Sequence, residues 1–223
     1  MTQHNDTLYD MNDPFAKKFP IIQQPEENGG ITYIVYIFEE IGEPRDFTEL
    51  LSVFDVAESN DRIILKLNTP GGQLDSTISI LDGIANTSAT VIAEIVGDVA
   101  SAGTIIALAC HGFYVAPHSE FMCHNFSGGL YGKGHELKAR SKFMHNNIED
   151  LMRKTYHKFL TRKEIESLIK GEDFYFGKEE VEERLNRLVE YRQKKQDKEA
   201  KRQEDDNDES MIEYLESKGY KLK

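Results

Sequence analysis

The sequence predicts an α/β domain built around a mainly parallel sheet. Apolar segments with strand character alternate with segments of helical periodicity, which is the pattern of parallel strands joined by helices. The strands are predicted at 31–38 ("ITYIVYIF"), 62–68 ("RIILKLN") and 90–99 ("TVIAEIVGDV"). The helices are predicted at 46–59, 73–86 and 101–110. A chain of 223 residues with 39% hydrophobic residues is long enough for one such domain with extensions.

The first two helices have sequence signals at their ends. Asp46 and Glu49 have the spacing of a capping box, which predicts a helix start at 46. The segment Thr69-Pro70-Gly71-Gly72 interrupts the chain between the second strand and the helix at 73–86. The periodicity of that helix predicts one apolar face, made of Leu74, Ile78, Leu81 and Ala85.

A long helix is predicted at about 135–160, after a glycine-rich segment at 127–134. Its length would be about 38 Å, more than a compact domain of this size needs, so we expect it to pack on another subunit. Thr161 and Glu164 then have capping-box spacing for a shorter helix that ends near Gly171. The apolar stripe of the long helix consists of Leu137, Met144, Ile148, Leu151, Met152 and Phe159.

Composition divides the chain into three parts. Residues 1–30 are polar, contain three prolines and end in two glycines, so they are interpreted as an irregular arm. Residues 31–190 form the predicted domain. Residues 191–223 are a charged extension, either a solvated helix or a linker, and Ser210 with Glu213 could cap a short helix in it.

Charge and cysteine content exclude several classes of protein. The net charge of −12 is unsuited to nucleic acid, whose phosphates require clustered Lys and Arg. No apolar run approaches the roughly 18 residues that a membrane span needs. Cys110 and Cys123 form no CxxC pair, are interpreted as small buried hydrophobes, and favour a reducing compartment such as the cytoplasm. No metal or cofactor is expected.

One serine and one histidine have the placement that nucleophilic catalysis requires. In "DVASAGTIIALAC", residues 98–110, Ser101 lies where a strand ends and an apolar helix begins. A serine hydroxyl needs a base, which is usually histidine, and a carboxylate usually orients that base. Among the seven histidines, His124 follows a strand-like run and precedes the glycine-rich segment, so it is predicted to lie at a sheet edge.

The other parts of a serine-hydrolase site are less specific. Glu172 and Asp173 are adjacent candidates for the acid, and spacing alone does not choose between them. An oxyanion site needs backbone N–H groups aimed at the developing charge, and Gly72 and Ala102 are the candidates, each at a helix start.

Together, four segments resemble the proteolytic subunit of the Clp protease family over about residues 31–188. They are "LNTPGGQLDSTISILDGI", "GDVASAGTIIALA", "FMCHNFSGGLYGKGHEL" and "EDFYFGKEEVEERL". The resemblance implies that Ser101 is the nucleophile, His124 the general base and, read without gaps from His124, Asp173 the acid. It also implies that Gly72 and Ala102 form the oxyanion site. It assigns substrate binding to Gly128 and Gly129.

The resemblance also implies a fold and an assembly. The fold is a ClpP/crotonase-type spiral of repeated ββα units with a protruding handle helix. The assembly is a homo-oligomer, two stacked heptameric rings with the active sites inside. The resemblance further implies an AAA+ unfoldase as partner and unfolded polypeptides as substrates, which makes the expected function that of an ATP-dependent serine endopeptidase.

Three alternatives remain open at the level of sequence. A crotonase-type acyl-CoA enzyme shares the fold, but its chemistry needs no serine at the oxyanion site. A non-catalytic ring subunit that pairs with an active paralogue would have lost the triad. A Ser-Lys signal-peptide peptidase would use a lysine base and usually a membrane segment.

Overall fold

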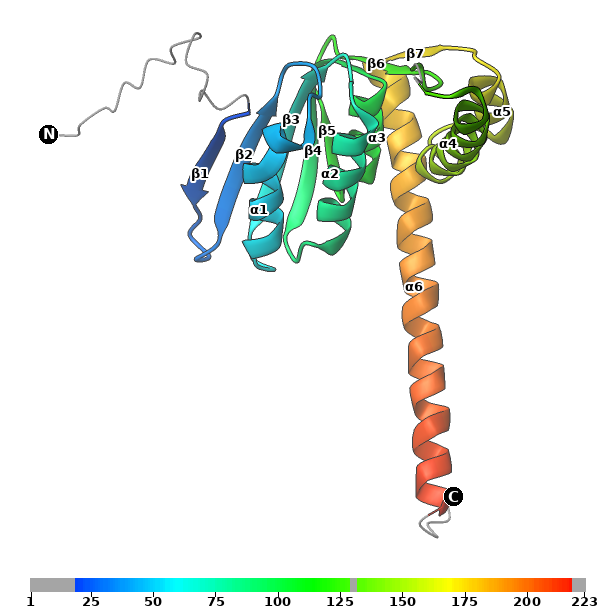
Figure 1. Ribbon diagram of the computed structural model, residues 1–223. Coiled ribbons are helices and arrows are strands. Elements are labelled where there is room, and N and C mark those ends of the chain that lie inside the picture. Colours follow the sequence, from blue (N-terminus) through cyan, green and yellow to red (C-terminus); the bar gives the residue numbers. More distant parts are fainter. Residues whose placement is uncertain (1–18, 129–131, 218–223) are drawn as a thin grey trace, which may run out of the picture.

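A single sheet with helices packed against it forms the body of the molecule (Figure 1). The computed structural model describes residues 19–128 and 132–217, without the side chains beyond Arg202. The seven strands have the order β1-β2-β3-β4-β6-β7, and β5 pairs with β4 off this path. The predicted mixed α/β architecture with a mainly parallel sheet is therefore confirmed.

The strands β2, β3 and β4 form the parallel centre of the sheet. Their bounds are Ile31–Ile37, Arg62–Thr69 and Thr90–Ala100. Beyond β4, the strand β5 (Gly112–Val115) pairs with residues 92–95 and β6 (Glu120–Cys123) with residues 98–100, both in parallel. The two edge strands, β1 (Ile21–Pro25) and β7 (Phe174–Gly177), run antiparallel to β2 and β6. The carboxyl ends of β4 and β6 thus lie side by side at one edge of the sheet.

The helices pack unequally on this sheet. In Figure 1, α1 and α2 lie against one face of the strands, whereas the second half of α6 extends away from the body. The burial pattern of β3 also shows that the two faces of the sheet differ. Ile63, Leu65 and Leu67 point to one face and are fully buried, whereas Lys66, on the opposite face, pairs with Glu94 of β4. The helices are α1 (Thr48–Val56), α2 (Leu74–Asn86), α3 (Ala102–Ala109), α4 (Gly134–Thr155), α5 (Arg162–Ile169) and α6 (Lys178–Ser217).

The N-terminal arm was predicted too long. Residues 21–25 of the predicted arm form β1, because they pair antiparallel with β2 across a turn closed by the Glu26 N–H and the Gly30 carbonyl. Phe19 is buried and stacks on Phe47 at a centroid distance of 4.5 Å. The remainder of the predicted arm, residues 1–18, lies outside the described residues.

Two details of the first helices also differ from the prediction. The capping box uses Glu43 and Asp46, around a 3-10 turn at Pro44–Phe47, so Asp46 is not the residue that starts α1. In α2 the buried face contains Ile80 and Ile84, whereas Ile78 is 48% exposed and Ala85 is exposed. The face is rotated because Gly83 leaves room for the ring of Phe54 of α1, whose nearest atom would be 2.3 Å from a Cβ at that position.

The long helices end at different residues from those predicted. The helix α4 stops at Thr155, and its buried residues are Ile148 and Met152. Ile148 is therefore packed inside its own subunit. In contrast, α6 is one helix from Lys178 to Ser217, so Ser210 lies inside it and caps no separate helix. No helix in the described part of the chain is long and apolar enough to cross a membrane.

The proposed boundary at residue 190 falls inside α6, which still contacts the domain there. Arg192 donates hydrogen bonds to the carbonyls of Leu108 and Cys110, where α3 ends. A cation at a helix C-terminus stabilises unpaired carbonyl groups. The charged extension is thus anchored to the body through its first turn.

Both cysteines are free and buried, as predicted. Burial raises the pKa of Cys110 and of Cys123 to about 12, so both thiols stay protonated and behave as small apolar groups.

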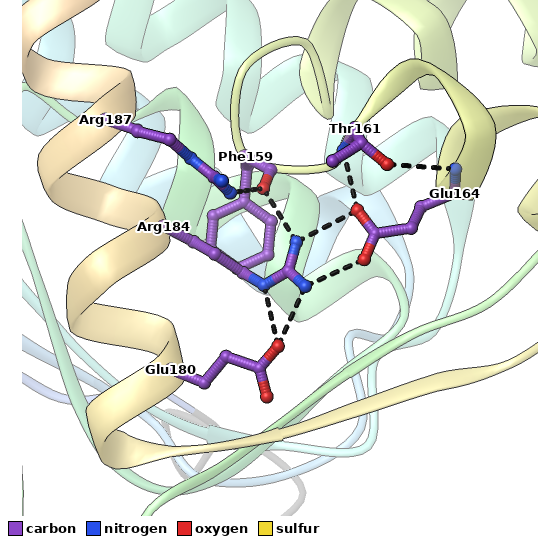
Figure 2. A network of polar contacts seen from close by, with 6 residues as sticks. All are labelled: Phe159, Thr161, Glu164, Glu180, Arg184 and Arg187. Carbon is purple, nitrogen blue, oxygen red and sulfur yellow. Dashed lines mark hydrogen bonds and ion pairs between the residues drawn. The ribbon is translucent and has the colours of Figure 1, made fainter.

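A polar network joins α6 to α5 and to the turn that precedes it (Figure 2). The Arg184 guanidinium binds the Glu164 carboxylate with two hydrogen bonds, of 3.0 and 2.8 Å, and also binds Glu180. The carbonyl of Phe159 accepts from both Arg184 and Arg187. The capping box of Thr161 and Glu164, predicted from their spacing, is confirmed. This network fixes α6 against the end of the sheet that carries β7, because Arg184 also lies 4.2 Å from the centroid of the Phe176 ring.

The network predicts a pH-dependent contribution to stability. Arg184 lowers the pKa of Glu164 from its ordinary 4.5 to about 2. A lowered folded-state pKa stabilises the protein above the unfolded value, and the contribution is lost as the pH falls from about 4.5 towards about 2. Glu164→Gln, which keeps a side chain able to cap α5, should lower the free energy of unfolding at pH 7 by about 2–3 kcal/mol.

Urea unfolding of both proteins at pH 7 and at pH 3 checks this prediction. The difference between them should shrink to less than half at pH 3. Glu180→Gln is the matched control, because Glu180 binds the same arginine from a half-exposed position and should matter less, by about 0.5–1 kcal/mol. A Glu164→Gln effect that is equal at both pH values would contradict the assignment.

Candidate active site

Ser101 occupies a strained position between β4 and α3. Its backbone angles are φ 54° and ψ −124°, in a region that non-glycine residues rarely adopt. Such a conformation costs on the order of 1–3 kcal/mol and persists only where the surroundings impose it. Here the Ser101 N–H donates a 2.9 Å hydrogen bond to the carbonyl of Met122 in β6, and the helix begins at the next residue. The serine is thus held at the edge of the sheet, half-buried.

The close approach of the β3–α2 connection explains why small residues surround Ser101. Gly71 has a φ of 94°, and a Cβ on it would lie 2.6 Å from the Ser101 Cβ and 2.9 Å from the Ala102 nitrogen. A Cβ on Gly103 would similarly lie 2.6 Å from the Thr69 side chain. Glycine is therefore required at both positions for the connection to reach the start of α3.

The two predicted oxyanion donors, Gly72 and Ala102, each follow one of the residues in the contact between Gly71 and Ser101. Ala102 is the first residue of α3, so its N–H has no acceptor within the helix and is favoured by the helix dipole for binding negative charge. Gly72 lies beside Ile41, whose N–H and carbonyl bind the Gly71 carbonyl and the Gln73 N–H. Within the described residues, the Gly72 N–H itself has no protein acceptor. Neither amide has a protein acceptor among the described residues.

The sheet brings His124 and Asp173 to the same edge as Ser101. In the parallel pair β4–β6, Ala100 lies opposite Met122, so Ser101 and His124 follow neighbouring strand ends. In the antiparallel pair β6–β7, Cys123 lies opposite Phe174, and His124 and Asp173 are the next residues outward on the two strands. Glu172 is one residue further from this pairing, and its N–H closes the turn after α5 on the Ser167 carbonyl.

The register places the three residues at the ends of neighbouring strands. Among the described residues, His124 has no hydrogen bond or ion pair with Ser101 or with Asp173. His124 is half-buried and Asp173 is exposed. Catalytic hydrogen bonds are often long or poorly aligned without substrate, so this geometry is compatible with a triad that closes on binding.

A cleft of about 190 Å³ begins one residue after His124. It lies between the segment that leaves β6 and the middle of α4, and Asn125 fixes its wall by donating to the Ile169 carbonyl. Gly128, predicted to bind substrate, is part of the lining, whereas Gly129 lies outside the described residues. The lining residues are Asn125, Phe126, Gly128, Ser141, Met144, His145, Ile148, Glu149 and Ile169.

Three residues that were not predicted as part of the site contact the segment around Ser101. Gly71, rather than Gly72, makes the close approach to the serine. Thr104 and Tyr156 lie beneath it as a buried hydroxyl pair, 2.7 Å apart. Thr104 follows Ser101 at the i+3 position, which is a detectable local pattern, but Tyr156 is 55 positions away and no local signal indicates it.

The sequence is similar to those of known proteins. The family model of Clp protease matches residues 32–183. The ATP-dependent Clp protease proteolytic subunit 2 of Chlamydia trachomatis is 28% identical over 160 residues, which cover 66% of this chain and 75% of that protein. The protein of the same name from Pseudomonas aeruginosa is 35% identical over 82 residues, covering 36% of this chain and 41% of that protein.

Since the family model matches more than half of the chain, the chain belongs to the Clp protease family. It is a serine-type peptidase, as the resemblance implied. The expected ClpP-type fold is confirmed, and the comparisons do not favour an acyl-CoA enzyme or a non-catalytic subunit.

The contact at Gly71 leads to a sharp prediction. Gly71→Ala should lower kcat/KM by about 100-fold or more, because the added Cβ must displace Ser101 or the Ala102 amide and a displacement of about 1 Å costs roughly that much. A fluorogenic peptide assay, together with circular dichroism to confirm folding, measures the effect.

Gly177→Ala is the matched control, since a Cβ there has no atom within 4 Å. That variant should retain wild-type activity. Full activity of Gly71→Ala would show that the close approach is not needed for catalysis.

Proposed function

We propose that Ser101, His124 and Asp173 form the catalytic triad of this peptidase and that Gly72 and Ala102 supply the oxyanion N–H groups. The observation that carries the proposal is the strained Ser101 backbone at the start of α3, beside amides without acceptors and next to the strand that ends in His124. The register of β6 and β7 favours Asp173 over Glu172 as the acid.

The proposed reaction is acyl transfer to serine followed by hydrolysis. His124 removes the proton of the Ser101 hydroxyl as Oγ attacks the substrate carbonyl carbon, and the carbonyl oxygen becomes an oxyanion facing the Gly72 and Ala102 N–H groups. His124 then gives the proton to the leaving amine as the C–N bond breaks. A water molecule, deprotonated by the same histidine, releases the acyl group and restores Ser101.

The substrate is proposed to be an extended polypeptide. The cleft beside His124 is lined by Asn125, Phe126 and Gly128 on one side and by residues of α4 on the other. It suits a peptide that runs past the serine and places one side chain in the cleft. Because the substrate has to be extended, we expect folded proteins to be cleaved only after they have been unfolded.

Membership of the Clp protease family implies a Clp ATPase as partner and an oligomeric assembly. We propose an AAA+ unfoldase as that partner and two stacked heptameric rings as the assembly. The first half of α4 supports a subunit contact, because most of its side chains are exposed, including Phe143 at 67%. A cytoplasmic location remains a prediction from the two unpaired cysteines.

The residue of α4 that we propose for the subunit contact differs from the one expected from the sequence. Ile148 was expected to meet a facing subunit, but it is only 8% exposed because it packs on the core of its own subunit. A substitution there would disturb the fold itself. Phe143 is the apolar side chain of α4 that remains for a partner.

Labelling and cleavage with Ser101→Ala test the nucleophile. The variant should lose fluorophosphonate labelling and peptide cleavage, by on the order of 10⁴-fold or more, while its oligomeric size is unchanged. Wild-type labelling of Ser101→Ala would reject the assignment. A wild-type protein that neither labels nor cleaves would instead identify a non-catalytic ring subunit.

Substitutions at the adjacent residues Asp173 and Glu172 test which of them is the catalytic acid. Asp173→Asn should lower kcat strongly, because the imidazole is no longer held in the required tautomer, whereas Glu172→Gln should have little effect. A larger loss at Glu172 would reverse the assignment.

Phe143→Asp tests the assembly contact. Burying one phenylalanine contributes about 2–3 kcal/mol per subunit, so a charge at this position should dissociate the complex into smaller species. Asn146→Asp is the control, because it adds the same charge at an exposed polar position of α4. Light scattering measures the size of each variant, and an intact Phe143→Asp complex would exclude this face of α4 as the contact.

A further inference from the structure

A buried pair of hydroxyl groups lies directly beneath the proposed nucleophile. The Thr104 hydroxyl donates a 2.7 Å hydrogen bond to the carbonyl oxygen of Ser101. The Tyr156 hydroxyl lies 2.7 Å from the same Thr104 oxygen. Both side chains are fully buried, at 0% exposure. Tyr156 comes directly after α4, so this contact reaches from the end of that helix to the first turn of α3.

The direction of the two hydrogen bonds follows from counting protons. A carbonyl oxygen can only accept, so the single hydroxyl hydrogen of Thr104 points to Ser101. The hydrogen between Thr104 and Tyr156 must therefore come from Tyr156. The buried thiol of Cys123 also contacts both hydroxyl groups and stays protonated, because burial raises its pKa to about 12. Burial raises the pKa of Tyr156 well above its ordinary value of 10, so the phenol remains a donor at every working pH. The result is a chain of donors that runs from Tyr156 through Thr104 to the Ser101 carbonyl.

The carbonyl at the end of this chain belongs to the peptide group that carries the Ala102 N–H. Because a peptide group is planar and trans, its C=O and N–H point in opposite directions, and holding one aims the other. A hydrogen bond to the carbonyl also polarises the peptide and makes its N–H a better donor. The hydroxyl pair thus binds the Ser101 carbonyl, and the N–H of the same peptide group is the one that faces the oxyanion in the proposed mechanism.

Ordinary helix geometry does not require these hydroxyls. The Ser101 carbonyl already accepts from the Thr104 N–H at 2.9 Å and, more weakly, from the Ile105 N–H at 3.4 Å. A valine and a phenylalanine would fill the same buried volume without the cost of burying two polar groups. Neither the helix nor the packing requires these hydroxyls, so their effect on the Ser101 carbonyl is the better explanation of their presence.

We propose that Tyr156 is a positioning residue for catalysis, which acts through Thr104 to aim and strengthen the Ala102 N–H for the oxyanion. The proposal rests on the proposed function, because it assumes that Ser101 is the nucleophile. It predicts an effect on the transition state rather than on substrate binding, since the oxyanion exists only after attack.

Tyr156→Phe tests the proposal by removing one oxygen and keeping the ring. The variant should have a kcat about 10-fold lower and an unchanged KM. The expected fall is smaller than the roughly 100-fold or larger effect of losing an oxyanion donor, because the Ala102 N–H is still present. Its affinity for a peptide boronic acid should fall by the same factor, because the tetrahedral boron adduct on Ser101 places an oxygen in the oxyanion site.

Substitutions at Thr104 show whether the two hydroxyls act as one unit. Thr104→Val should reproduce the loss, Thr104→Ser should recover most of it, and Thr104→Val combined with Tyr156→Phe should be no worse than either alone. Tyr33→Phe, which removes a hydroxyl from a buried tyrosine of β2, should match the wild type.

The outcomes separate this inference from the proposed function. Wild-type kcat and boronate affinity in Tyr156→Phe, with Ser101→Ala inactive, would overturn the inference alone. A fall in kcat that appears only when the complex dissociates would also overturn it. So would a fall in kcat that is equally large in Thr104→Ser, which keeps the hydroxyl. Activity that survives in Ser101→Ala would overturn the proposed function itself.

Discussion

The active-site region depends on one close contact, between the turn that follows β3 and the start of α3. Gly71 lies so near Ser101 that no side chain fits between them. The opposite side of Ser101 is held by the hydrogen bond from its N–H to Met122. Confined from both sides, the serine adopts a left-handed backbone conformation that it would not adopt alone. The unpaired amides at the helix start follow from this arrangement.

The peptide between Ser101 and Ala102 is where the fold and the proposed chemistry meet. Its N–H faces the site as the first free donor of α3, and its carbonyl accepts from the Thr104 hydroxyl. Tyr156, which completes that chain of hydroxyls, is supplied by the end of α4. A peptide group whose carbonyl is already held keeps its orientation when charge develops at its N–H, and preorganisation of this kind is a large term in hydrolase catalysis.

The proposed histidine base and acid lie just outside the paired residues of their strands. His124 and Asp173 lie just beyond the paired residues of β6 and β7, two strands of four residues each. Arg184 lies over the ring of Phe176 in β7. It also binds Glu164, as Figure 2 shows. These contacts hold β7, while Asp173, the residue that precedes the strand, is exposed. For the proposed triad to form, Asp173 has to come into contact with His124.

The sequence by itself determined the strands and helices of the domain, the family, and the placement of Ser101 and His124 at strand ends. These follow from local signals: apolar periodicity, small residues at a helix start, and a capping box such as that of Thr161 and Glu164. Tertiary structure decided what depends on distant contacts. Residues 21–25 became a strand only because β2 offered an open edge, and Ile148 became part of the core because α4 packs on its own subunit. Tyr156 reached Thr104 because α4 ends there, 52 residues away in sequence, and no local pattern carries that information.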